Sequence, residues 1–192
     1  TAWLAGRAAA GRDAVMAVEE DWYSEATPTP TKQANRKNSM RTIEQILTLW
    51  SASLMTSDQV KEWAQMQIEK MDAPPMELFD LLNDGPEKCL KQSAEDFSPR
   101  PRRLSFNEEF CIRACNLSLN SDKETLSFAL WTSRRCMGED LENPLVSLSY
   151  LVDHLLEDCG DEAVALAQIR KALPPLLAQC ASVAAPFLSD VD

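Results

Sequence analysis

The sequence predicts an all-α protein, an irregular antiparallel bundle of about seven helices, with repeat-like helix hairpins as an alternative arrangement. Through most of the chain, apolar residues recur at the three- and four-residue spacing of an amphipathic helix. Only five glycines occur in 192 residues, and no apolar–polar alternation reaches the length of a strand. Tryptophan spacing and loop lengths show no fixed period, which favours an irregular bundle over a repeat solenoid.

The composition changes at Met40. Residues 1–39 carry five Lys or Arg and five Asp or Glu, so the entire net charge of −11 belongs to residues 40–192. The stretch "TPTPTKQANRKNS" before Met40 is rich in proline and polar residues, which form neither a helix nor a core. We expect residues 1–39 to be a flexible N-terminal extension or a mistranslated segment upstream of an initiating Met40. Residues 40–192 are expected to form a single all-α domain.

Three helices are predicted in the first part of this domain. In "TIEQILTLWSASL" one face carries an apolar stripe that consists of Ile43, Ile46, Leu47, Trp50 and Leu54. Thr56 and Gln59 form a capping-box signal for a second helix, whose stripe consists of Val60, Trp63, Ala64, Ile68 and Met71. "APPMELFDLLNDG" predicts a short third helix, with Pro75 near its start and Gly85 as a left-handed end.

Four further helices are expected after a proline-containing loop. Pro99 and Pro101 interrupt the helical pattern, and Ser105 and Glu108 form a capping-box signal for the start of the next helix. The predicted helices cover 106–119, 122–137, 143–159 and 161–181, and Pro174-Pro175 should kink or split the last one. The predicted apolar face of 143–159 consists of Leu145, Leu148, Leu151, Val152, Leu155 and Cys159.

The cysteines and the single histidine give no recognisable catalytic or metal motif. Six cysteines lie in apolar helical patterns without a CxxC pair, which is typical of buried reduced thiols. Cys111 and Cys115 lie one helical turn apart, but no further ligands accompany them. His154 is expected at the edge of an amphipathic helix; a functional role would pair it with Cys111, Cys115 or a carboxylate.

Several function classes are disfavoured. The sequence lacks a nucleophile elbow, a phosphate-binding glycine loop and a His–Glu metal motif, so we expect no enzyme activity and no cofactor. No apolar run approaches the ~18–20 residues that span a bilayer, and we expect a cytoplasmic protein without membrane contact. Arg100, Arg102 and Arg103 are too few to attract nucleic acid to so acidic a chain; they should pair with the acidic surface or with an acidic patch on a partner.

Residues 55–82, "MTSDQVKEWAQMQIEKMDAPPMELFDLL", resemble small bacterial immunity proteins of polymorphic toxin systems. The shared pattern is an amphipathic helix with Trp-Ala, then a proline and a short helix of the form L-x-D-L. The resemblance implies a protein that binds and occludes a toxin domain, with an acidic face in the place that nucleic acid would take.

We therefore predict a non-enzymatic acidic module that binds a basic protein partner, most specifically an immunity- or antitoxin-like inhibitor. A secretion chaperone or adaptor, and a divalent-metal enzyme that uses the carboxylate clusters "NEEF", "GEDLEN" and "EDCGDE", are the alternatives. The oligomeric state stays open. We expect six acidic residues to be exposed and take them as candidate partner-binding residues. They are Glu108, Glu109, Glu139, Asp140, Glu157 and Asp158.

Overall fold

A computed structural model describes residues 41–188 of the chain. These residues form helices and connecting loops, with no strand among them, which confirms the predicted all-α class. All of them belong to one compact unit. The predictions for residues 1–39 and for Met40 as a start lie outside the described residues. In the described part no helix is both long enough and apolar enough to cross a membrane.

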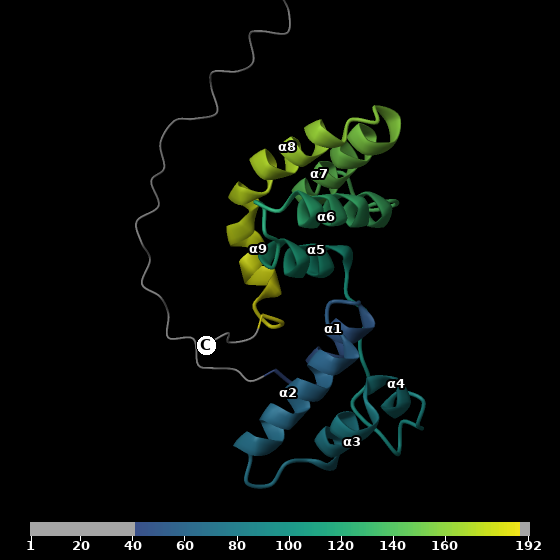
Figure 1. The fold of residues 1–192 in the computed structure, drawn as a ribbon. Helices are drawn as coiled ribbons and strands as arrows, with labels where there is room; N and C mark the ends of the chain where they lie inside the picture. Colours follow the sequence, from purple (N-terminus) through teal and green to yellow (C-terminus); the bar gives the residue numbers. More distant parts are fainter. Residues whose placement is uncertain (1–40, 189–192) are drawn as a thin grey trace, which may run out of the picture. The chain divides into compact units, whose positions relative to one another are not determined.

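The first group of helices begins with two capping boxes. The Thr42 side chain caps α1 (Ile43–Ser51), and the Thr56 side chain caps α2 (Ser57–Lys70), each with a reciprocal glutamine three residues later. α2 packs beside α3 (Met76–Asp84), which ends at Gly85 with φ of +78° (Figure 1). The sequence did not predict α4 (Pro86–Cys89), a single turn that follows this glycine directly.

A first hydrophobic cluster holds this group together; it consists of Ile46, Leu47, Val60, Trp63, Ala64, Leu78, Leu81, Cys89 and Phe97. α1 is also buried on a second side, which the predicted stripe did not include. The Thr48 hydroxyl accepts the Arg102 N–H at 3.1 Å, and Leu49 belongs to the hydrophobic cluster of the later helices. α1 therefore contributes to both clusters.

The second group consists of α5 (Phe106–Cys115), α6 (Asp122–Arg135), α7 (Pro144–Asp153), α8 (Glu162–Ala172) and α9 (Leu177–Ala184). α9 packs against α5 although about sixty residues separate them, while α6 contacts both α7 and α8 (Figure 1). Four aromatic rings, those of Phe106, Phe110, Phe128 and Trp131, lie within 6.1 Å of a neighbour in this group. α5 ends four residues before its predicted boundary, where the Asn116 amide donates to the Ile112 carbonyl.

Two predicted long helices are interrupted. The predicted helix over 143–159 is α7 followed by a π-helical turn, His154–Asp158, and the one over 161–181 is split by a 3₁₀ turn at Pro174–Leu176. The split confirms the effect expected of the proline pair. The apolar face predicted for 143–159 is wrong at two positions: Leu151 and Cys159 are exposed. The π-helical turn changes the helical period, so residues after Asp153, Cys159 among them, leave the α-helical stripe. Leu151 precedes the turn and is exposed on α7 itself.

Candidate protein-binding surface

Glu108, a predicted partner contact, is held by its own chain. Arg102 donates to both carboxylate oxygens, at 2.6 Å and 3.1 Å, and the Ser105 N–H donates at 2.9 Å. The hydrogen bond from Arg102, with that from Ser105, lowers the pKa of Glu108 from 4.5 to about 2. The carboxylate thus neutralises a local arginine and completes the capping box of α5, which leaves little of its charge for a partner.

Glu109 was chosen as an exposed residue, and that choice is wrong. The residue is only 7% exposed. Its carboxylate accepts hydrogen bonds from Arg113 at 2.9 and 3.2 Å and from Arg135 of α6 at 3.3 Å. Sequence spacing could indicate the Arg113 contact, because the two residues are four apart on one helix. The contact with Arg135 depends on how α6 packs against α5.

Arg113 connects three parts of the structure. It donates to the backbone carbonyl of Ala52, at the end of α1, at 3.1 Å. Its guanidinium carbon also lies 4.6 Å from the ring centroid of Trp131 in α6, within cation–π range. Glu109 and Arg113 are therefore part of the packing between α1, α5 and α6.

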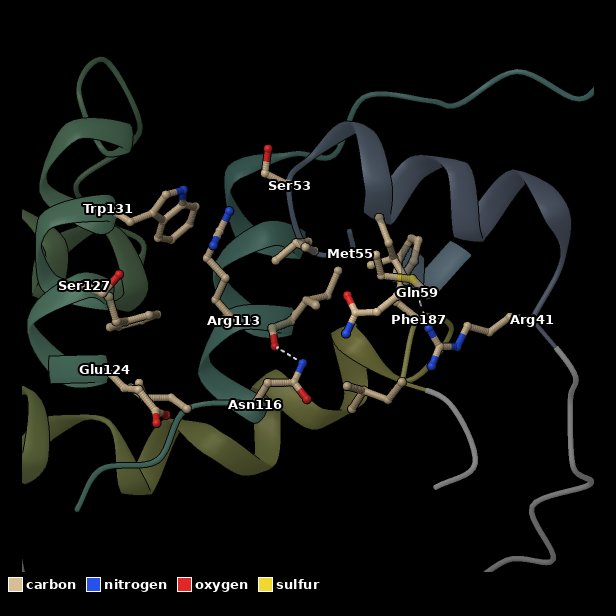
Figure 2. Close-up of a pocket in the computed structure, with 16 residues that line it drawn as sticks. Arg41, Ser53, Met55, Gln59, Arg113, Asn116, Glu124, Ser127, Trp131 and Phe187 are labelled. Carbon is tan, nitrogen blue, oxygen red and sulfur yellow. Dashed lines mark hydrogen bonds between the residues drawn. The ribbon is translucent and has the colours of Figure 1, made fainter. Parts of the chain in front are cut away.

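A groove of about 530 Å³ lies beside these residues (Figure 2). Trp131, Arg113 and Phe187 line it, together with residues from the α1–α2 connection such as Met55. Apolar side chains such as Leu49, Ile112 and Phe128 also line it, and Glu124, Asn116 and Gln59 supply polar groups. A groove of this composition can accept an apolar side chain or a short amphipathic segment.

The strongest charge asymmetry lies elsewhere, in residues 136–169, which we call the acidic segment. It contains no Lys or Arg, and its eight carboxylates are Glu139, Asp140, Glu142, Asp153, Glu157, Asp158, Asp161 and Glu162. All except the half-buried Asp153 are exposed. None of the eight forms an ion pair with Lys or Arg within residues 41–188. The segment therefore presents most of the net charge of the chain to solvent.

The acidic loop after α6, residues 136–143, lies against α7, which leads into the acidic stretch 157–162. The Gly138 N–H, in the loop after α6, donates to the Tyr150 hydroxyl of α7 at 3.2 Å. Burial, and then the nearby Asp153 carboxylate, raise the pKa of the Cys136 thiol. The end of α6 is thus close to the last turns of α7, and Figure 1 shows the connection from α7 to α8 on the right of this group.

Four of the six candidate residues, Glu139, Asp140, Glu157 and Asp158, are exposed as expected. The Asp158 carboxylate also forms a 2.7 Å hydrogen bond with His154 Nδ1. The sequence prediction did not single out Glu142, Asp161 and Glu162, although counting the Lys and Arg positions shows that 136–169 lacks both.

The thiols differ strongly in accessibility. Cys89, Cys111, Cys136 and Cys180 are buried as predicted, and Cys115 is half-buried, whereas Cys159 is exposed. The hydrogen bond with Cys180, and then burial, raise the pKa of the Cys111 thiol; burial likewise raises that of Cys115. Within the described residues, no group of three or more His, Cys, Asp or Glu side chains is arranged to hold a metal ion.

No protein-family description matches the chain, and searches of curated proteins and of solved structures also find no similar protein.

Proposed function

We propose that the protein is a non-enzymatic binding module whose acidic segment binds a basic protein partner, as an immunity- or antitoxin-like inhibitor does. The observation that carries the proposal is the presence of eight carboxylates and no Lys or Arg in residues 136–169. Charge complementarity steers a basic partner to such a surface and repels nucleic acid. Occlusion of the partner's own anion-binding surface would inhibit a nuclease-like target.

The proposed surface consists of Glu139, Asp140 and Glu157, with Asp158 beside them. Glu139 and Asp140 lie in the loop after α6, which contacts α7 through Gly138 and Tyr150, and Glu157 and Asp158 lie in the π-helical turn that follows α7. Glu108 and Glu109 are not part of it, because arginines of the chain bind their carboxylates. Six free cysteines support a place in the reducing cytoplasm, where thiols persist.

The test uses the full chain, tagged at the C-terminus, as bait in lysate of its own source organism. We expect one basic protein to be retained near 1:1, with retention that falls between about 50 and 500 mM salt as surface charges are screened. The variant E139K/D140K/E157K should lose the partner.

The matched control is E62K/E69K/D72K, which makes the same charge change on exposed residues in and after α2. It should keep the partner. Equal loss in both variants would attribute retention to net charge alone, and retention by the first variant would contradict the proposed surface.

The groove in Figure 2 favours a second candidate function, that of an adaptor or secretion chaperone for an amphipathic segment. Ser127 is exposed on α6 at the groove wall, so S127W should fill the groove without disturbing the core. Partner loss in S127W but not in E139K/D140K/E157K would favour the adaptor over the inhibitor.

A further inference from the structure

An exposed cysteine, a histidine and an aspartate lie in contact around the π-helical turn after α7. The Cys159 sulfur is 3.6 Å from His154 Nε2, and Asp158 Oδ2 is 2.7 Å from His154 Nδ1. Cys159 is thus placed as the nucleophile, His154 as the base and Asp158 as the carboxylate that orients the base. This is the arrangement by which proteins activate a thiol. His154 was expected at the edge of an amphipathic helix, where a functional role would pair it with Cys111, Cys115 or a carboxylate. The structure pairs it with the carboxylate of Asp158 and with a different cysteine, Cys159.

The π-helical turn explains this arrangement. The Cys159 N–H donates to the His154 carbonyl at 3.1 Å, five residues back, which is the hydrogen bond that defines a π-helix. Residue 159 is thereby stacked beneath residue 154, while Asp158, four residues after the histidine, reaches the other ring nitrogen. The His154 and Asp158 side chains are 59% and 72% exposed, so a small molecule can approach the thiol.

We infer that Cys159, His154 and Asp158 form a thiol–disulfide exchange site that takes cationic low-molecular-weight disulfides. The preference for a cation follows from Glu157, Asp161 and Glu162, which are exposed close by in the sequence with no Lys or Arg between residues 136 and 169. An anionic disulfide would meet repulsion from the same carboxylates.

The exchange step balances without any further reactant. His154 Nε2 takes the proton of the Cys159 thiol, while Asp158 accepts the Nδ1–H and holds the ring in this tautomer. The thiolate attacks one sulfur of the disulfide, a new S–S bond forms at Cys159 and the disulfide's own S–S bond breaks. The departing thiolate takes the proton from the imidazolium. Cys159 is oxidised to a mixed disulfide, and half of the small disulfide is reduced to a thiol.

The experiment measures the rate of mixed-disulfide formation on the full native chain by intact mass, with peptide mapping to locate the adduct. The probes are cystamine as the cationic disulfide, 2-hydroxyethyl disulfide as the neutral one and oxidised glutathione as the anionic one. We expect the first adduct on Cys159, and cystamine to react fastest at low salt with an advantage that shrinks in 0.5 M NaCl. C159S should show no fast adduct on the five remaining thiols.

Two further variants separate activation from simple exposure. H154Q should slow the reaction of Cys159 with the neutral disulfide by about tenfold, because the proton acceptor is lost. D158N should slow it too, whereas E87Q, which removes one charge from an exposed carboxylate of α4 outside the acidic segment, should not. In denaturant, H154Q and the unsubstituted chain should react at equal rates, because the arrangement of the three side chains is gone.

Two results would overturn the inference: a first adduct on Cys115 or a buried thiol, or equal native rates for Cys159 in H154Q and the unsubstituted chain. A faster reaction with oxidised glutathione than with cystamine at low salt would overturn the proposed preference for cations. None of these outcomes depends on whether the acidic segment binds a protein partner.

Discussion

Glu108 shows how a single carboxylate serves two local contacts, and the E108Q variant separates them. Glutamine at this position still supports a capping box, so the variant removes the ion pair with Arg102 but keeps the cap. Because the pair is partly exposed, we expect a loss of about 1 kcal/mol in the free energy of unfolding at pH 7. The folded-state pKa of about 2 lies below the ordinary value of 4.5, so this stability is complete above about pH 4.5.

The lowered pKa of Glu108 also determines how the effect of E108Q on stability depends on pH. As the pH falls from 4.5 towards 2, Glu108 becomes protonated, and the stability difference between E108Q and the unsubstituted chain should decrease to near zero. Urea unfolding at a series of pH values measures it. A difference that stays constant down to pH 2.5 would show that the ion pair does not stabilise the fold.

Glu109 pairs with two arginines at once, whereas Glu108 pairs with one. Its carboxylate is the common partner of Arg113 and Arg135, so E109A would leave two partly buried guanidinium groups without a counter-charge. We expect a loss of about 3 kcal/mol in the free energy of unfolding, in the range that breaking a buried ion pair costs. E139A, which removes an exposed carboxylate without an ion pair, should change it by less than about 0.5 kcal/mol. Similar effects from both variants would contradict the assigned role.

At the scale of elements, the helix starts depend on side-chain caps. The Thr56 hydroxyl accepts the Gln59 N–H at 3.2 Å, and the Gln59 side chain accepts the Thr56 N–H at 2.8 Å. T56A should lower the free energy of unfolding by about 1 kcal/mol, and T56S should restore most of it, because serine is an equally good cap. Chemical denaturation of the two variants tests this. Equal stabilities for T56A and T56S would mean that the cap contributes nothing.

These caps also explain which elements the sequence could predict. Thr56 with Gln59, and Ser105 with Glu108, are local patterns whose hydrogen bonds span three residues, and the structure contains both. The π-helical turn after Asp153 has no comparable local pattern, so the exposure of Cys159 was missed. The burial of Glu109 was missed for a different reason: one of its partners, Arg135, is 26 residues away in sequence and is brought close only by the packing of α6. Local side-chain patterns therefore predict where helices begin, whereas the burial and the partners of the candidate residues depend on tertiary contacts.

At the scale of the whole molecule, the uneven distribution of charge should cost stability as well as attract a partner. Eight carboxylates without Lys or Arg in residues 136–169 repel one another in the folded state, and salt weakens that repulsion. By contrast, α2 interleaves Lys61 and Lys70 with its acids. We therefore expect E139Q/E157Q/E162Q to raise the free energy of unfolding at low salt by about 0.5 kcal/mol, a magnitude typical of exposed charge interactions.

The control variant, E62Q/E69Q/D72N, removes the same number of charges from the region of α2, where each acid has a lysine nearby in the sequence. It should leave the stability unchanged or lower it slightly. In 1 M NaCl the Debye length falls to about 3 Å, and the gain from E139Q/E157Q/E162Q should disappear. Urea unfolding of both variants at 20 mM and 1 M NaCl distinguishes charge repulsion from a change in local packing or helix propensity. A gain that persists in 1 M NaCl would trace to altered local packing or helix propensity, and the acidic segment would then carry no electrostatic strain for a basic partner to relieve.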